Sequence, residues 1–223
     1  MKKCILTVLT SAFLFAPIQS FAAGISVGGT VWYQYWENSE DTIEFDPDWM
    51  YGPALAVAIT DNLRINTVFY YGEFDTLVNG TSPGSTERYD SDTSLGYRIH
   101  DYVTILAGFK YMHCSLETTG FPAMTYTFDI YGPAVGGALS IPLIDYFSLS
   151  AGLSGIYMWE KDKIKSFSGT EKNKIRGLSY NSTAALVYFI QPASVTLSIG
   201  GRYQYYKQTN ADKMGQKFYG ITA

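Results

Sequence analysis

Acid–base side chains are few in this chain of 223 residues, so each can be weighed individually. The chain has two histidines, His100 and His113. Ser115 follows His113 closely, and a histidine beside a serine is the pairing that activates a hydroxyl group in a lipid-modifying hydrolase. Asp90 and Asp92 lie in the preceding run, and a histidine paired with an aspartate activates water in a protease. Hydrolysis is therefore the first chemistry to compare with the strand pattern.

The strand pattern separates these groups. Side chains alternate between the two faces of a strand, and His113 shares its odd parity with the apolar residues of its run. Asp90 and Asp92 have even parity and lie on the polar face. His100 falls in a short turn, where we interpret it as a solvated turn residue. We therefore predict no enzyme and assign no catalytic residue, metal ligand or cofactor; no metal spacing or phosphate loop is found.

Most of the chain after Gly24 alternates in polarity with a period of two residues. In the first run Ile25, Val27, Val31 and Tyr33 alternate with small or polar residues. About ten such strips follow one another, separated by turn residues, and this is the signature of a transmembrane β-barrel. Short turns alternate with longer polar stretches at 38–47, 75–88, 115–125, 160–176 and 208–215. We predict an all-β fold: a single closed antiparallel transmembrane barrel of about ten strands, with short periplasmic turns and long extracellular loops.

The composition supports a chain with an apolar outside and a wet inside. Aromatic residues make up 16% of the chain and charged residues 16%, without a helix-length apolar run after residue 22. The net charge of −4 argues against a nucleic-acid partner. Outward aromatic residues gather toward the loop ends, as in the girdle at a lipid–water interface. The predicted girdle includes Tyr33, Tyr35, Trp49, Tyr51, Tyr71, Tyr111, Trp159, Tyr203 and Tyr205.

Both ends of the chain carry information. Lys2 and Lys3, an apolar run, and the small-x-small site that ends at Ala22 form a secretory signal peptide. We predict a signal peptide at 1–22 and one barrel domain at 23–223. The last run is shorter than its neighbours and ends in Ala223, whereas small barrels usually end in an aromatic residue. We expect native residues to be missing beyond it, which would leave the first strand partly unpaired.

In its signal peptide, girdle and loop asymmetry, the chain resembles the small Gram-negative outer-membrane β-barrel proteins. Within that superfamily it looks most like small porin-like or OmpW-type barrels. The resemblance implies a location in the cell outer membrane, where lipid and lipopolysaccharide are the expected partners.

Many inward positions are small, which leaves room in the lumen for water or a solute. The open alternative is that inward charges fill this room. The hairpin turn at His100 predicts that Asp92 lies opposite Lys110. The charged residues expected to face the lumen are Arg64, Asp90, Asp92, Arg98, Lys110 and Arg202.

Three functions remain open at this point. The leading hypothesis is a small channel or passage for small or hydrophobic solutes. The alternative is a structural or adhesion barrel that acts through its extracellular loops. A lipid-modifying barrel enzyme is the third.

A proline motif occurs twice, as Tyr-Gly-Pro-Ala at 51–54 and again at 131–134. Proline cannot donate to a strand ladder, so each copy must form a bulge or leave a gap. One interpretation is a pair of tolerated bulges. The other is a lateral seam for apolar ligands, formed by Gly52, Pro53, Gly132 and Pro133.

Two polar stretches have opposite charge. The first is acidic, and either is a solvated loop or binds a divalent cation or a cationic partner. The stretch at 160–176 is basic, and either meets lipopolysaccharide phosphates or pairs with the acidic stretch. The acidic residues are Glu37, Glu40, Asp41, Glu44, Asp46 and Asp48; the basic ones are Lys161, Lys163, Lys165, Lys172, Lys174 and Arg176.

Overall fold

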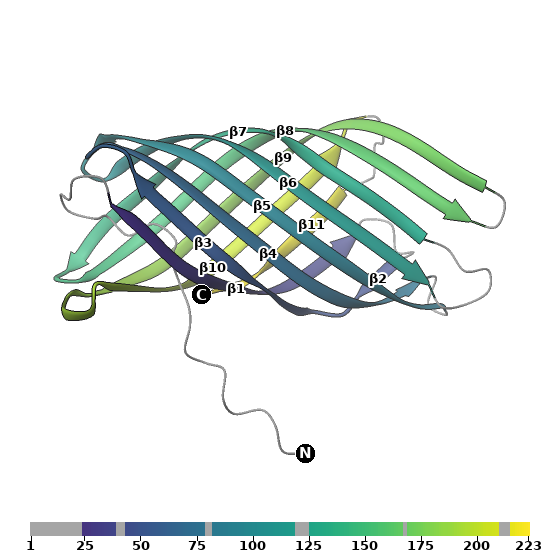
Figure 1. Cartoon of the computed structure of the whole chain (residues 1–223), viewed down its shortest axis with the longest axis horizontal. Coiled ribbons are helices and arrows are strands. Elements are labelled where there is room, and N and C mark those ends of the chain that lie inside the picture. The colour runs from purple at the N-terminus through teal and green to yellow at the C-terminus, as the bar shows by residue number, and fades with distance from the viewer. Residues whose placement is uncertain (1–23, 39–42, 79–81, 119–124, 167–168, 210–214) are drawn as a thin grey trace, which may run out of the picture.

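A computed structural model describes residues 24–38, 43–78, 82–118, 125–166, 169–209 and 215–223. These residues form one closed antiparallel barrel of ten long strands with one short extra strand (Figure 1). The predicted fold class is confirmed. The predicted signal peptide, and Glu40 and Asp41 of the acidic stretch, lie outside the described residues.

The strands follow one another around the barrel in chain order, and their bounds come directly from the pairing ladder. They are β1 (Ile25–Asn38), β2 (Ile43–Phe45), β3 (Asp48–Ala58), β4 (Leu63–Val78), β5 (Ser82–His100), β6 (Val103–Thr118), β7 (Thr125–Ile144), β8 (Phe147–Ser166), β9 (Gly169–Ile190), β10 (Val195–Gln208) and β11 (Gly215–Thr222). A 3-10 turn, η1 (Gln191–Ala193), connects β9 to β10.

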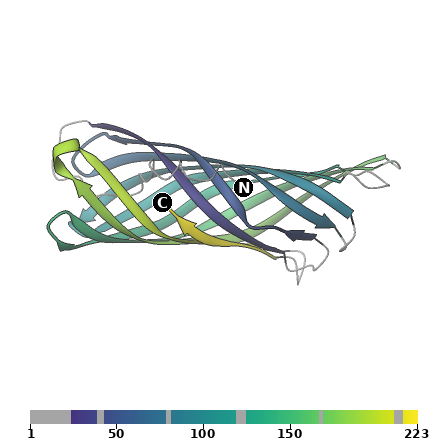
Figure 2. The same ribbon diagram turned by 90° about the horizontal axis from the view of Figure 1, so that it is seen from below.

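Consecutive long strands pair antiparallel, and β11 closes the barrel by pairing with β1. The small strand β2 lies outside this order and, among the described strands, pairs with the far end of β4. All the strands are strongly tilted, as Figures 1 and 2 show from two directions. A tilted, staggered ladder is what closure of a sheet into a barrel requires.

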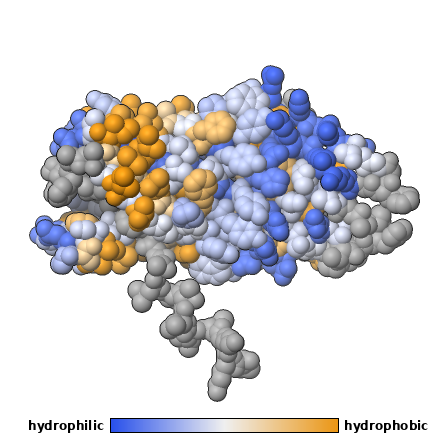
Figure 3. All heavy atoms as spheres, viewed as in Figure 1, coloured by the Kyte–Doolittle hydropathy of each residue, from blue (hydrophilic) through white to orange (hydrophobic). Residues whose placement is uncertain are grey.

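The outer face changes in polarity along the barrel axis. Ile25, Leu139, Leu153 and Ile199 are among the apolar side chains exposed toward the turn end, by 46–74%. Figure 3 shows hydrophobic residues gathered at this end of the visible face and hydrophilic ones at the other. Such exposure costs free energy in water, and lipid removes that cost. No helix in the described part of the chain is long and apolar enough to cross a membrane.

Outward aromatic rings form a band between these two regions, which we call the aromatic band. Tyr33 contacts Trp49 at a ring-centroid distance of 5.0 Å, and Tyr71 contacts Tyr89 at 4.9 Å. Every predicted girdle residue except Tyr111 makes at least one ring contact of this kind, and Tyr111 hydrogen-bonds to Asp129. Tyrosine and tryptophan at this level have an apolar ring in lipid and a polar group at the water interface.

Most of the predicted long loops are strands, and this corrects the sequence-based boundaries. The β4–β5 ladder continues to Val78 and Ser82, and the β8–β9 ladder to Ser166 and Gly169. A membrane-spanning strand needs about 9–11 residues, whereas β8 has 20 and β9 has 22. The alternation of apolar residues stops where the outer face leaves lipid, but backbone pairing does not. We call the part beyond the aromatic band the projecting end.

At the turn end the wall is incompletely paired. The last strand, β11, has eight residues, and its ladder with β1 runs from Asn38 to Trp32. Val31 and Ala223 exchange two backbone hydrogen bonds of 2.8 and 3.0 Å. Residues 25–30 pair in the described structure with β3 alone. The prediction that the first strand is partly unpaired is therefore confirmed.

Candidate functional site

Five charged side chains meet inside the barrel, and we call them the ionic network. Lys110 of β6 lies opposite Asp92 of β5, with 2.7 Å between Nζ and Oδ1, so the predicted register is confirmed. Lys110 is also 3.4 Å from Asp90. Arg88 donates two hydrogen bonds to Asp90, of 2.9 and 2.7 Å, and Arg202 of β10 pairs with Asp92. The strand parity explains this meeting, because 88, 90 and 92 are successive inward positions of β5.

The network has three cations and two carboxylates, and all of it is shielded from water except Asp92, whose side chain is 27% exposed. The side chains of Arg88 and Asp90 are 0% exposed, and those of Lys110 and Arg202 are 4% exposed. The Arg202 guanidinium lies 4.9 Å from the Trp32 ring centroid, and Arg88 lies 4.0 Å from that of Phe218. Hydrogen bonds and aromatic faces together compensate for part of the desolvation cost of buried charge.

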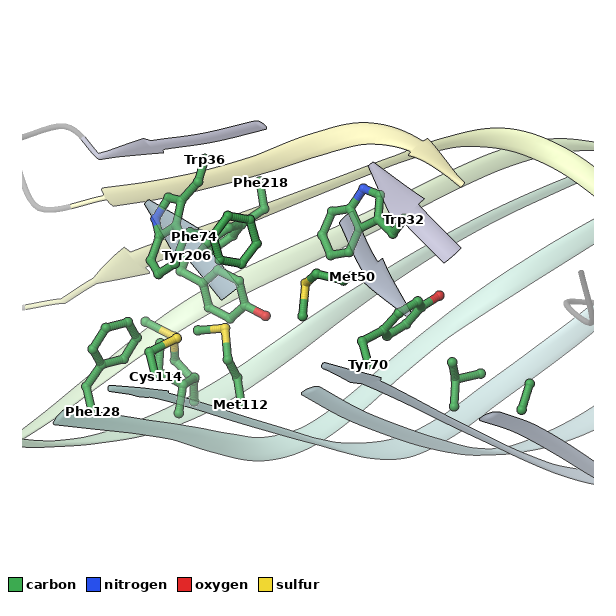
Figure 4. Close-up of a cluster of buried hydrophobic side chains, with 14 residues drawn as sticks. Trp32, Trp36, Met50, Tyr70, Phe74, Met112, Cys114, Phe128, Tyr206 and Phe218 are labelled. Carbon is green, nitrogen blue, oxygen red and sulfur yellow. The ribbon is translucent and has the colours of Figure 1, made fainter. Parts of the chain in front are cut away.

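Aromatic and apolar side chains fill the lumen beside the ionic network. Trp36 contacts Phe218 at 4.9 Å and Phe74 at 5.7 Å, and these rings converge with Tyr206, Phe128 and two methionines in Figure 4. The buried Val187 of β9 lies toward the turn end, opposite Ser148. Each of the other barrel strands contributes at this level a side chain that is exposed by 2% or less. These are Trp32, Met50, Tyr70, Arg88, Met112, Ile130, Met158, Gln204 and Phe218. Together they close the lumen at this level, and we call them the closed layer.

A cavity of about 140 Å³ lies on the turn side of the closed layer. Asp92, Lys110 and Arg202 border it, and the rest of its lining is mostly small: Ser94, Gly108, Ala138, Gly152, Thr183, Ala185 and Ser198 are among these residues. Small inward residues thus leave room in this half of the barrel.

The remaining predicted lumen charges lie apart from the network. Arg98 is at the turn end, where it donates to the Asp61 carbonyl at 2.6 Å and to Asn62 at 3.3 Å. Arg64 pairs in the ladder with Gly96, near the same end. The network includes Arg88 instead, which sequence reasoning missed because 75–88 was assigned to a loop. Its parity with Asp90 and Asp92 was the available signal.

A second cavity, of about 380 Å³, lies in the projecting end, and we call it the vestibule. Two carboxylates of β8 line it, Glu160 and Asp162, which are exposed by only 2% and 8%. Gln208 donates a 3.0 Å hydrogen bond to Glu160 Oε2. Glu160 Oε1 and Asp162 Oδ1 have no hydrogen-bond partner in the described structure. These carboxylates were also missed, because 160–176 was predicted as a loop.

The carboxylate pair lies beyond Trp159 of the aromatic band, outside the membrane-spanning part of β8. Successive even positions place Glu160 and Asp162 on the same inward face. Burial, followed by the negative charge of Asp162, raises the pKa of Glu160. Within the described ranges no lysine or arginine lines the vestibule. The vestibule therefore favours positive charge.

Neither histidine belongs to the ionic network or to the carboxylate pair of the vestibule. His113 is on the outer wall, where its Nδ1 lies 2.8 Å from Asp129 Oδ1, and Tyr111 donates to the same oxygen at 2.8 Å. His100 is the last residue of β5, one position before the turn at 101–102, so the predicted turn is displaced by one residue. In the described ranges no three His, Cys, Asp or Glu side chains are grouped to hold a metal ion.

The two proline motifs form gaps in the ladder rather than bulges. The β3–β4 pairing skips 52 and 53 and then resumes in unchanged register, and the β7–β8 pairing skips 132 and 133 in the same way. A methyl group at Gly52 would collide with the Phe69 carbonyl, and one at Gly132 with the Tyr157 carbonyl. The bulge interpretation is therefore wrong, and at both gaps the neighbouring strands are in close contact.

The outer face of β8 and β9 is basic beyond the aromatic band. Lys161 lies opposite Lys174, and Lys163 lies opposite Lys172. With Arg176 of β9 and Lys207 of β10, these residues form what we call the basic outer surface. The acidic Glu37 instead pairs with Lys217 of β11 at 3.3 Å.

Comparison with known proteins gives a fold and no family. No protein-family model matches the chain, and no curated protein matches its sequence. Among solved structures, the outer-membrane protease OmpT of Escherichia coli is similar, with a TM-score of 0.64 and 12% identity, over 90% of this chain and 93% of that one. The translocator domain of the autotransporter NalP of Neisseria meningitidis has a TM-score of 0.45 and 11% identity, over 92% and 88% of the two chains. The chain therefore has the fold of an outer-membrane β-barrel.

Proposed function

We propose that the protein is exported to the outer membrane, with residues 1–22 removed, and recognises an extracellular ligand at its projecting end. The observation that carries this proposal is the arrangement of the lumen: a vestibule of about 380 Å³ lies above a closed layer. A ligand that enters the vestibule meets a floor of buried side chains instead of a continuous path.

Opening the floor would be costly. The ionic network spans β5, β6 and β10, so any path through it must separate Asp92 from Lys110 and Arg202. Breaking a buried pair by removing one partner typically costs about 3–5 kcal/mol. A closed barrel that acts through its extracellular part, the alternative from the sequence, is therefore favoured over a channel.

A gated passage is the second candidate, because cavities lie on both sides of the closed layer. A proteoliposome swelling assay distinguishes the two functions. The proposal predicts that vesicles containing the protein swell no faster in isotonic sugar or amino-acid solution than empty vesicles. Swelling that increases with protein content would overturn the proposal and favour a passage. An enzymatic role gains no support from His113, which bonds to Asp129 on the outer wall.

We also propose lipopolysaccharide as a partner of the basic outer surface. Like charges that lie directly opposite each other on neighbouring strands repel, and Lys163 lies opposite Lys172 and Lys161 opposite Lys174. Tyr131 offsets part of this repulsion, because the Lys161 ammonium lies 4.8 Å from its ring centroid. Phosphate groups placed between the lysines would remove this repulsion. The position of the surface, just beyond the aromatic band, is where the lipid headgroups of the outer leaflet lie.

A further inference from the structure

The vestibule is unusual in the balance of its polar groups. Its only charged lining residues, among those the structure describes, are the carboxylates Glu160 and Asp162. Arg88 lies deeper, where its guanidinium binds Asp90 and stacks on Phe218, so it is already engaged. The vestibule therefore has no cation of its own, and its negative charge comes from Asp162 and from Glu160 once that group is ionised.

Two of the carboxylate oxygens have hydrogen-bonding capacity that the protein does not use. Glu160 Oε1 and Asp162 Oδ1 are buried and have no partner in the described structure, whereas Gln208 occupies only Oε2 of Glu160. A buried acceptor without a donor is unfavourable, and more so when it is charged. An ammonium group has three N–H donors and a positive charge, and would satisfy both oxygens.

The rest of the vestibule wall suits a flat apolar body. Trp36 of β1 stacks on Phe45 of β2, with 3.8 Å between ring centroids and 3° between ring planes. Phe128 of β7 meets Trp36 edge-on, with 6.4 Å between ring centroids, and Tyr126 lies 5.5 Å from Phe128. Tyr206 of β10 completes the aromatic lining. Aromatic faces attract organic cations as well as apolar rings. The small strand β2 thus contributes to this wall, because it places Phe45 against Trp36.

We infer that the vestibule binds a small organic cation, a primary ammonium group carried on a flat apolar body. The ammonium group lies between Glu160 and Asp162, and the apolar body packs against the aromatic wall. This inference rests on the proposed function and names the ligand class that the projecting end recognises. A metal ion is a poorer fit, because the described residues supply two carboxylates and no third acidic, histidine or cysteine ligand.

The test uses the folded barrel, residues 23–223, in a nonionic detergent at about pH 9, where Glu160 is ionised and a primary amine is still charged. The probe is 2-phenylethylammonium chloride in isothermal titration calorimetry. We expect saturable binding of the amine and at least tenfold weaker binding of 2-phenylethanol, which has the same ring without the charge. Glu160→Gln and Asp162→Asn should each weaken amine binding at least tenfold. Asp129→Asn is the matched control, because it removes a carboxylate from the outer wall, and should bind as the wild type does.

Heat-modifiable migration on gels checks that each variant is folded. Equal affinity for amine and alcohol, or unchanged amine binding in Glu160→Gln and Asp162→Asn, would overturn the inference. Neither result bears on closure of the lumen, which the swelling assay tests separately. If Glu160→Gln fails to fold, Asp162→Asn still tests the inference. Asp162 is the other carboxylate of the pair, and it lies nearer the rim of the barrel.

Discussion

Lys110 and Asp92 lie directly opposite each other on β6 and β5, and their side chains form a 2.7 Å ion pair inside the barrel. Asp92 also binds Arg202, which lies on β10. One carboxylate thus connects the neighbouring strands β5 and β6 to β10, on the other side of the lumen, and it does so at the level where the lumen is closed.

This geometry predicts that Asp92 contributes more to the stability of the barrel than Lys110 does. Asp92→Asn leaves three cations facing one carboxylate, and we expect the free energy of unfolding to fall by about 3–5 kcal/mol. Lys110→Met leaves two cations facing two carboxylates, so it should cost clearly less. Urea unfolding in lipid vesicles measures both. The control is Lys217→Met, which breaks an ion pair at the surface and should cost at most about 1 kcal/mol. Equal costs for Asp92→Asn and Lys217→Met would contradict the role of the network.

The two proline motifs predict a steric effect at their glycines. Gly52→Ala and Gly132→Ala place a methyl group against the carbonyl oxygens of Phe69 and Tyr157, and each should destabilise the barrel by about 1–3 kcal/mol. Gly155→Ala is the matched control, because a methyl group there meets nothing within 4 Å. Folded yield and unfolding midpoint measure the difference. Full stability of both Gly52→Ala and Gly132→Ala would mean that the strands are looser at these gaps than the structure shows.

The basic outer surface predicts lipopolysaccharide binding that depends on charge. Replacing Lys163, Lys172 and Lys174 together by glutamine should weaken binding several-fold in a co-purification or surface plasmon resonance assay, because phosphate contacts are lost. Added salt should weaken wild-type binding more than that of the triple variant. The control, Lys217→Gln, removes a lysine of β11 that already pairs with Glu37. If the control and the triple variant bind equally well, this surface is not the binding site.

The carboxylate pair predicts a dependence of stability on pH. Burial and the charge of Asp162 raise the pKa of Glu160 above its ordinary 4.5, so the folded protein holds a proton that the unfolded chain releases. The free energy of unfolding should therefore fall as pH rises from about 4.5 through about 8, the raised pKa of Glu160. Glu160→Gln should remove much of this slope. A slope unchanged in Glu160→Gln would contradict the assignment.

The same proton affects ligand binding. Amine affinity should increase as pH rises over this window, because Glu160 must ionise while the amine, with a pKa near the roughly 10.4 of lysine, remains charged. The groups that face Glu160 or interact with it are Asp162 of its own strand, Cys114 of β6, Tyr126 of β7, and Tyr206 and Gln208 of β10.

The sequence predicted best the part of the barrel that lipid surrounds. Lipid makes the outer face apolar, so alternation indicated the strands, their parity and the Asp92–Lys110 register. Beyond the aromatic band both faces are polar, and the signal disappeared although the strands continued. Arg88, Glu160 and Asp162 were missed for that reason. The contact between Arg202 and Asp92 could not be predicted either, because it crosses the lumen and depends on strand tilt and stagger, which alternation does not specify.

Single-channel recording in a planar lipid bilayer tests the central claim, a vestibule above a closed lumen, most directly. Purified protein inserted into the bilayer should give no steady ion conductance, because the closed layer leaves no wet path. As a positive control, the double variant Arg88→Ala with Phe218→Ala removes two side chains of that layer and should give measurable conductance if it folds. A steady conductance from the unmodified protein would contradict the account and make the protein a channel.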